Sequence, residues 1–195
     1  MGISRTDCPP FSPMNILSIL LLLLPTVTPL PGKWVKQKIG QDITVTLPDH
    51  LIPMTPEDLI QRYPSVRTPL GAFTDSNRLA DFSVNVSATQ WPDGNIEFAK
   101  TFFKSSVMNM FDRVEMIQEG IREQHNKKFI FFEFDSRLNP DKRNISTQDA
   151  LVRYTYIMYL VEPSRTLVFS FTCTRDVKEE WQSVANQIMK SIRVK

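Results

Sequence analysis

Residue types that carry catalysis are sparse in this sequence of 195 residues. It contains two histidines, His50 and His125, and two cysteines, Cys8 and Cys173. Neither histidine has a second histidine or cysteine at the spacing that zinc sites use. The sequence has no nucleophile elbow, P-loop or dinucleotide fingerprint, and its six glycines leave little material for a phosphate-binding loop. We therefore expect no catalytic residue, no metal site and no cofactor.

Acidic residues offer two alternatives to this expectation. Glutamates recur every four residues at Glu115, Glu119 and Glu123. On a strand this spacing places all three on one face, which we interpret as a solvated polar edge, with a cation site as the alternative. An enzyme site assembled from scattered residues such as His50, Glu133 and Asp135 is the second alternative. No spacing argument pairs an acid, a base or a nucleophile among them, so the enzyme hypothesis is the less favoured one.

Cysteine usage points to a structural thiol. Cys173 alternates with Phe169 and Phe171, which places it on the apolar face of a predicted strand. A cysteine in such a position is a small buried hydrophobic residue rather than a nucleophile. If the N-terminal leader is removed, Cys173 is the only cysteine left, and no intramolecular disulfide can form.

The charge balance gives no sign of a nucleic-acid partner. Lysine and arginine number 23 against 21 aspartates and glutamates, for a net charge of +2. The basic residues are dispersed along the sequence, so no basic stripe of the kind that binds phosphate backbones is evident.

Residues 1–32 have the features of a leader. The apolar run Ile16–Leu24 is nine residues long, well short of the roughly 20 that span a bilayer as a helix. Arg5 precedes the run and Pro25 follows it, an order that resembles a secretory signal peptide. A disordered leader with a chance apolar run is the alternative, and the true start is Met1 or Met14. We expect export to the periplasm or the medium, with membrane contact only through the leader if it is not cleaved.

Residues 33–195 are expected to form one domain, and its first half contains short elements. Alternation predicts strands at Lys33–Lys38, Gln41–Leu47, Leu70–Thr74 and Asp81–Gln90. Thr55 and Pro56 have the residue types of an N-cap and a first helical position, for a brief helix that ends near Arg62. Asn95 is predicted to cap a longer helix, Ile96–Phe111, whose apolar positions keep to one face.

The second half is predicted to supply the centre of the sheet. We expect a hairpin of Val114–Gln124 and Lys128–Arg137, then strands Leu151–Val161 and Thr166–Thr174. Phe129–Phe132 is apolar on both faces, as in a strand covered on both sides. A closing helix, Val177–Ile192, follows with Trp181 as a core anchor. Asp176 and Glu179 have capping-box spacing at its start.

This order of elements resembles the PsbP/Mog-type fold family, which includes DcrB-like bacterial envelope proteins. The resemblance covers about Lys33 to Val194, and its closest match is the run Phe169-Ser170-Phe171-Thr172-Cys173, then Trp181, then Ile188-Met189-Lys190-Ser191-Ile192. It also includes Thr46-Leu47-Pro48 and Ala72-Phe73-Thr74-Asp75. The expected fold class is α+β, with a central antiparallel sheet flanked by helices on both faces, an α/β/α sandwich.

The resemblance implies a role without catalysis, because the matching residues belong to the core and members of the family are accessory or binding proteins. We expect a non-catalytic accessory or binding protein of the bacterial cell envelope with an unidentified protein partner. A chaperone-like binder of hydrophobic segments of secreted proteins is the alternative. The polar connection Leu138–Gln148 projects from the predicted sheet, where binding residues concentrate. We predict a contact surface there, made of Arg137, Asp141, Lys142 and Arg143; a merely long hairpin connection is the alternative.

Overall fold

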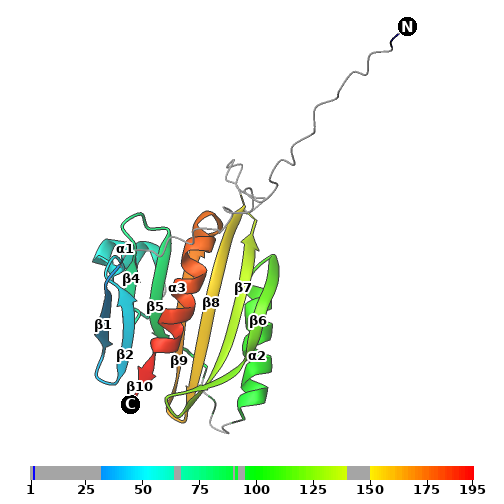
Figure 1. Ribbon diagram of the computed structural model, residues 1–195. Coiled ribbons are helices and arrows are strands. Elements are labelled where there is room, and N and C mark those ends of the chain that lie inside the picture. The colour runs from blue at the N-terminus through cyan, green and yellow to red at the C-terminus, as the bar shows by residue number, and fades with distance from the viewer. Residues whose placement is uncertain (1, 3–31, 64–66, 90, 92–94, 140–149) are drawn as a thin grey trace. The chain divides into compact units, whose positions relative to one another are not determined.

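The computed structural model describes residues 2, 32–63, 67–89, 91, 95–139 and 150–195 (Figure 1). The leader hypothesis for residues 1–32 therefore lies almost wholly outside the described residues. In chain order, the elements are β1 Trp34–Ile39, β2 Ile43–Pro48, β3 Ile52–Pro53, α1 Pro56–Arg62, β4 Gly71–Thr74, β5 Ala80–Val86, α2 Ile96–Met110, β6 Arg113–Gln124, β7 Lys127–Leu138, β8 Leu151–Glu162, β9 Arg165–Thr174, the 3₁₀ turn η1 Arg175–Val177, α3 Lys178–Ser191 and β10 Arg193–Val194.

Two antiparallel sheets organise the described residues. The larger has seven strands in the order β3-β4-β5-β9-β8-β7-β6, and the smaller has three in the order β1-β2-β10. The predicted α+β class is confirmed, and β7, β8 and β9 are interior strands as expected. The smaller sheet was not predicted from the sequence. β10 spans only two residues, Arg193 and Val194, too short for a recognisable alternation, and it pairs with β2 at the opposite end of the domain sequence.

α2 packs against side chains that project from alternate positions of β7 and β8. Ala99, Phe103 and Val107 of α2 form a cluster with residues of these strands, and the ring of Phe103 stacks on Tyr159 at a centroid distance of 4.1 Å. The strand residues in that cluster are Ile130, Phe132, Phe134, Ile157 and Tyr159. The side chain of Asn95 accepts a hydrogen bond of 3.0 Å from the amide of Phe98, so the predicted helix cap is confirmed.

α3 packs on residues that alternate with those beneath α2. Trp181 is 4% exposed and contacts Phe171 of β9, with ring centroids 5.5 Å apart. Gln182 donates to Glu133, the residue between Phe132 and Phe134 on β7. The predicted core position of Trp181 is confirmed. The predicted capping box was wrong, because Asp176 lies inside the turn η1 and the N-cap residue of α3 is Val177, which makes no side-chain cap bond.

A β-bulge in β6 overturns the expectation that the three glutamates share one face. The pairing of β6 with β7 shifts between Met116 and Gln118, which leaves Ile117 unpaired. One extra residue reverses the alternation beyond it. Glu119 consequently faces α2, where it forms ion pairs with Lys100 and Lys104. Glu115 precedes the bulge, so it projects to the other face of the strand, where it forms an ion pair with Arg113.

Candidate functional site

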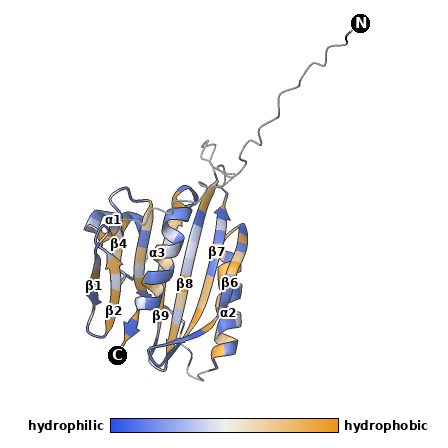
Figure 2. Cartoon of the chain, viewed as in Figure 1, coloured by the Kyte–Doolittle hydropathy of each residue, from blue (hydrophilic) through white to orange (hydrophobic). Residues whose placement is uncertain are grey.

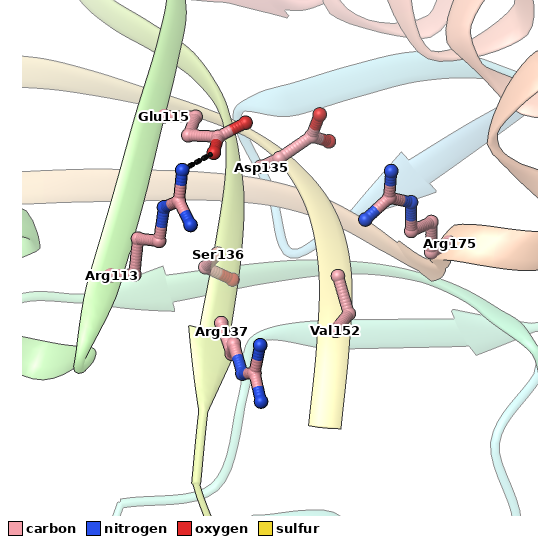
Figure 3. Close-up of a pocket in the computed structure, with 7 residues that line it drawn as sticks. All are labelled: Arg113, Glu115, Asp135, Ser136, Arg137, Val152 and Arg175. Atoms are coloured by element: carbon pink, nitrogen blue, oxygen red, sulfur yellow. Dashed lines mark ion pairs between the residues drawn. The ribbon is translucent and has the colours of Figure 1, made fainter. Parts of the chain in front are cut away.

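A polar cavity lies at the end of the seven-stranded sheet where β7 ends and β8 begins. Its volume is about 80 Å³, and it is lined by Arg113, Glu115, Asp135, Ser136, Arg137, Val152 and Arg175 (Figure 3). The elements explain this meeting. Arg113 opens β6, Arg137 is one residue before the end of β7, and Arg175 directly follows β9. Because neighbouring strands run antiparallel, the start of β6 and the ends of β7 and β9 lie at the same end of the sheet. In Figure 2 the arrowhead of β7 beside the cavity is blue, that is, hydrophilic.

Both carboxylates of the cavity have cationic partners. A nitrogen of Arg113 lies 2.6 Å from an oxygen of Glu115, the pair that Figure 3 marks with a dashed line. Lys178 of α3 donates to Oδ2 of Asp135 at 2.5 Å. Because Asp135 receives this bond from α3, the cavity opens on the side of the sheet that carries α3.

Two of the arginines have no such carboxylate. Nε of Arg137 donates to the side-chain oxygen of Asn139 at 2.9 Å, which is a neutral acceptor. The guanidinium group of Arg175 has no ion pair or hydrogen bond to another described residue. Figure 3 shows these two guanidinium groups on either side of Val152. Once the paired groups are set aside, the cavity carries an excess of two positive charges. It is therefore suited to an anionic group, which guanidinium groups bind through paired hydrogen bonds.

A second cavity of about 50 Å³ involves the residues next to these in sequence. Arg153 and Thr174 line it, whereas Val152 and Arg175 line the first cavity. Successive residues of a strand project to opposite faces, so the two cavities open on opposite sides of the same sheet end. Asp81 lies in the second cavity with Arg62, which donates a hydrogen bond to it. Burial raises the pKa of Asp81 above its usual value.

The predicted contact residues have different outcomes. Arg137 lies in the first cavity, as described above. Asp141, Lys142 and Arg143 lie outside the described residues. The prediction missed Arg113 and Arg175, since each stands at a boundary between two elements and neither belongs to the loop. Their position at the ends of strands that adjoin β7 or β8 was the one signal that the sequence offered.

The residues of the enzyme hypothesis are not brought together in either cavity. His50 lies against Trp181, with ring centroids 5.2 Å apart, and neither cavity is lined by a histidine. Glu133 accepts hydrogen bonds from Tyr154 and Gln182 in the core. Within the described ranges, no group of three histidine, cysteine or acidic residues is close enough to hold a metal ion. No helix in the same ranges is long and apolar enough to cross a membrane.

Comparisons with known proteins give structural neighbours only. No protein-family model matches the chain, and no curated protein sequence matches it. The solution structure of cyanobacterial PsbP (CyanoP) from Synechocystis sp. PCC 6803 superposes with a TM-score of 0.56 at 12% identity, covering 84% of this chain and 94% of that one.

Two other solved structures have lower scores. LpqN of Mycobacterium tuberculosis, described as involved in cell envelope biogenesis, has a TM-score of 0.49 at 13% identity, covering 83% of this chain and 90% of that one. The Saccharomyces cerevisiae Ran-binding protein Mog1p has a TM-score of 0.49 at 11% identity, covering 84% and 96%. At these identities the likeness concerns the fold alone. The assignment of the fold rests on the CyanoP structure, which has the higher TM-score of 0.56. The chain therefore has a PsbP-type fold, as the PsbP/Mog resemblance of its sequence implied.

Proposed function

We propose that this protein is a non-catalytic accessory protein of the bacterial cell envelope that binds an acidic segment of a protein partner. The binding site is the cavity of Arg113, Arg137 and Arg175. The observation that carries the proposal is that Arg137 and Arg175 line this cavity without a carboxylate partner among the described residues. A carboxylate from a partner would supply the missing acceptor, and a charge-assisted pair of this kind is among the stronger polar contacts.

The helices support this location for the site. α2 and α3 pack against side chains that alternate along β7. We infer from this alternation that helices cover both faces of the seven-stranded sheet, the α/β/α arrangement that the sequence suggested. The ends of the strands are then the part of the sheet available to a partner. Loops and strand ends on a rigid sheet are where binding residues concentrate.

The state of the reactive groups favours binding over catalysis. Cys173 is buried, and burial raises the pKa of its thiol to about 12, so it is a poor nucleophile near neutral pH. Both carboxylate oxygens of Glu133 already accept hydrogen bonds, from Tyr154, Gln182 and Gln118. His50 packs edge-on against Trp181. These groups act as parts of the core, whereas Arg137 and Arg175 of the arginine cavity have no carboxylate partner among the described residues.

Partner capture from bacterial envelope extracts tests the proposal. The full chain and its R137E/R175E variant are immobilised, and bound proteins are identified by mass spectrometry. K36E/K38E is the matched control, because it makes the same change in net charge at exposed lysines of the other sheet. We expect a specific protein that binds the wild type and the control but not R137E/R175E. Equal recovery on all three would show that the cavity is not the binding site.

The envelope location rests on the leader, and it has its own test. Replacement of Leu21 and Leu23 by arginine places two charges in the apolar run that a signal peptide requires. The variant should remain in the cytoplasm of a bacterial host, while the wild type is recovered outside it. Unchanged extracytoplasmic recovery of the variant would contradict export through this leader.

One observation favours a second candidate, a chaperone-like binder of hydrophobic segments. On the outer side of α2, Phe98 is 63% exposed and Phe102 is 42% exposed. Both contact Trp91, with centroid distances of 5.6 and 5.2 Å. If this aromatic group binds hydrophobic segments, F98S/F102S should abolish protection of an aggregating apolar peptide while R137E/R175E retains it. The reverse result would assign binding to the arginine cavity.

A further inference from the structure

The three-stranded sheet has one buried face and one exposed face, which differ sharply in chemistry. Ile39 of β1 and Ile43 and Val45 of β2 lie on the buried face. Along β1, the exposed residues Trp34, Lys36 and Lys38 alternate with residues of the buried face and point outward. This outer face therefore carries a tryptophan and two lysines at every second position of a single strand.

Strand pairing adds a third cation to this face. Lys38 of β1 and Arg193 of β10 both stand opposite Thr44, one on each side of β2. Val194, the neighbour of Arg193, is buried and stands opposite Ile43. Arg193 consequently projects to the same side as Lys38. We call Trp34, Lys36, Lys38 and Arg193 the basic face.

The cations of the basic face have no acidic partner among the described residues. Lys36, Lys38 and Arg193 form no ion pair with any described carboxylate. The nearby Asp42 instead accepts from Arg165. In contrast, Lys127 of the larger sheet is paired with Glu162 at 2.9 Å. Unpaired cations gathered on one sheet face form a local positive field that attracts an extended anionic surface.

Trp34 decides which anionic surface fits best. Its side chain is 38% exposed at the margin of the lysines, opposite Pro48. An indole ring has an apolar body and one polar N–H, and it partitions to the boundary between lipid headgroups and acyl chains. Lysines and arginines beside such a ring bind the anionic headgroups. We propose that the basic face docks on an anionic phospholipid surface. This adds a membrane contact to the one expected from the leader, and it does not depend on the arginine cavity.

Cosedimentation with vesicles tests the proposal in the full chain. Each variant is mixed with phosphatidylcholine vesicles that contain or lack phosphatidylglycerol, and the ratio of the two binding constants is measured. The leader is the same in every variant, so its own affinity for lipid enters both measurements. Each basic residue near an anionic surface strengthens binding roughly fivefold. We therefore expect K36E/K38E to lower the ratio by at least about 25-fold, with a smaller loss for R193E.

R137E/R175E is the matched control, because it changes the net charge equally at the other site. Its ratio should stay close to the wild-type ratio, and K36E/K38E should in turn keep the partner that the cavity binds. An equal loss in both variants would mean that net charge alone governs binding and would overturn the proposal. The proposal is also overturned if the wild type shows no preference for phosphatidylglycerol, or if the basic face binds an acidic protein or DNA but not these vesicles.

Tryptophan fluorescence gives a second readout of the same contact. Trp34 enters a less polar environment when the basic face meets lipid, so emission should shift to shorter wavelength as phosphatidylglycerol vesicles are added. W34F should lose this shift, because Trp181 is already buried and Trp91 packs against Phe98 and Phe102 of α2. A shift that persists in W34F would contradict the assignment of the contact to this face. Thermal melts of all variants check that the exposed substitutions leave the fold intact.

Discussion

The hydroxyl of Tyr154 donates a hydrogen bond of 2.8 Å to Oε1 of Glu133, a carboxylate that is fully buried between α3 and the seven-stranded sheet. Gln182 of α3 donates to the same oxygen at 2.7 Å, and Gln118 of β6 donates to Oε2. A buried charge is tolerated only when its hydrogen bonds are satisfied. This arrangement therefore fixes α3 and β6 relative to β7 through a single side chain.

Tyr154→Phe should destabilise the protein by about 1.5–3 kcal/mol, the usual range for a hydrogen bond to a charged group. The ring stays, but Oε1 of Glu133 loses one of its two donors. Urea unfolding measures the change in free energy. Tyr159→Phe on the same strand is the control, because it removes a hydroxyl while keeping the ring stacked on Phe103. Equal effects of the two substitutions would show that the bond to Glu133 contributes nothing specific.

Trp181→Ala should destabilise the domain by roughly 3–5 kcal/mol, the range for truncation of a buried large aromatic residue. The substitution removes the contacts of α3 with Phe171 and with His50. Denaturant melts followed by circular dichroism provide the measurement. A loss below about 1 kcal/mol would be at odds with a core position and would suggest a ring free for recognition.

Asp42→Asn should lower stability at neutral pH by less than about 1 kcal/mol, because the pair with Arg165 is partly solvated. The hydrogen bond from Arg165 holds the pKa of Asp42 below its usual value. The folded state therefore binds the proton more weakly than the unfolded state. The stabilisation is fully present above the unfolded pKa and is lost as pH falls through the folded pKa.

Urea melts at successive pH values from about 6 down to about 2 follow this linkage. The stability difference between wild type and Asp42→Asn should shrink toward zero in the acid range. Glu123→Gln, at an exposed position, controls for the loss of one carboxylate. A difference that stays constant across the whole range would rule out the ion pair as its cause.

The thiol of Cys173 should resist modification in the folded protein. Its side chain is 1% exposed, and burial raises the pKa of the thiol to about 12, so the reactive thiolate form is scarce at pH 8. A C8S variant isolates this residue. A disulfide reagent should label it only at the rate of unfolding, and fully in guanidinium. Rapid labelling under native conditions would contradict burial.

Local patterns were sufficient for several features of the fold. Three features depend only on residues that are close in the sequence: the run in β7 that is apolar on both faces, the alternation in β9, and the helix cap at Asn95. Burial of Trp181 and Cys173 followed from the same periodicities, because an apolar stripe must be covered. These features are confirmed since local sequence and tertiary packing favour the same conformation at these positions.

Features that depend on pairing between distant segments could not be predicted in this way. The bulge at Ile117 separates Glu115 from Glu119, although their spacing on a regular strand would place them together. The pairing of β10 with β2 creates the second sheet, and neither strand indicates the other as its partner. The choice of partner strand has no local signature, since the alternation of one strand is compatible with several neighbours.

The charged sites show the same division most clearly. The sequence by itself determined that the cations are dispersed, that catalytic groups are scarce and that Arg137 stands at a strand end. Only the tertiary structure brought Arg113 and Arg175 to Arg137 around one cavity, and only the pairing of β1, β2 and β10 placed Arg193 on the same sheet face as Lys38. A surface charge pattern is set by which strand ends and faces meet in space, and these meetings depend on contacts between residues far apart in the chain.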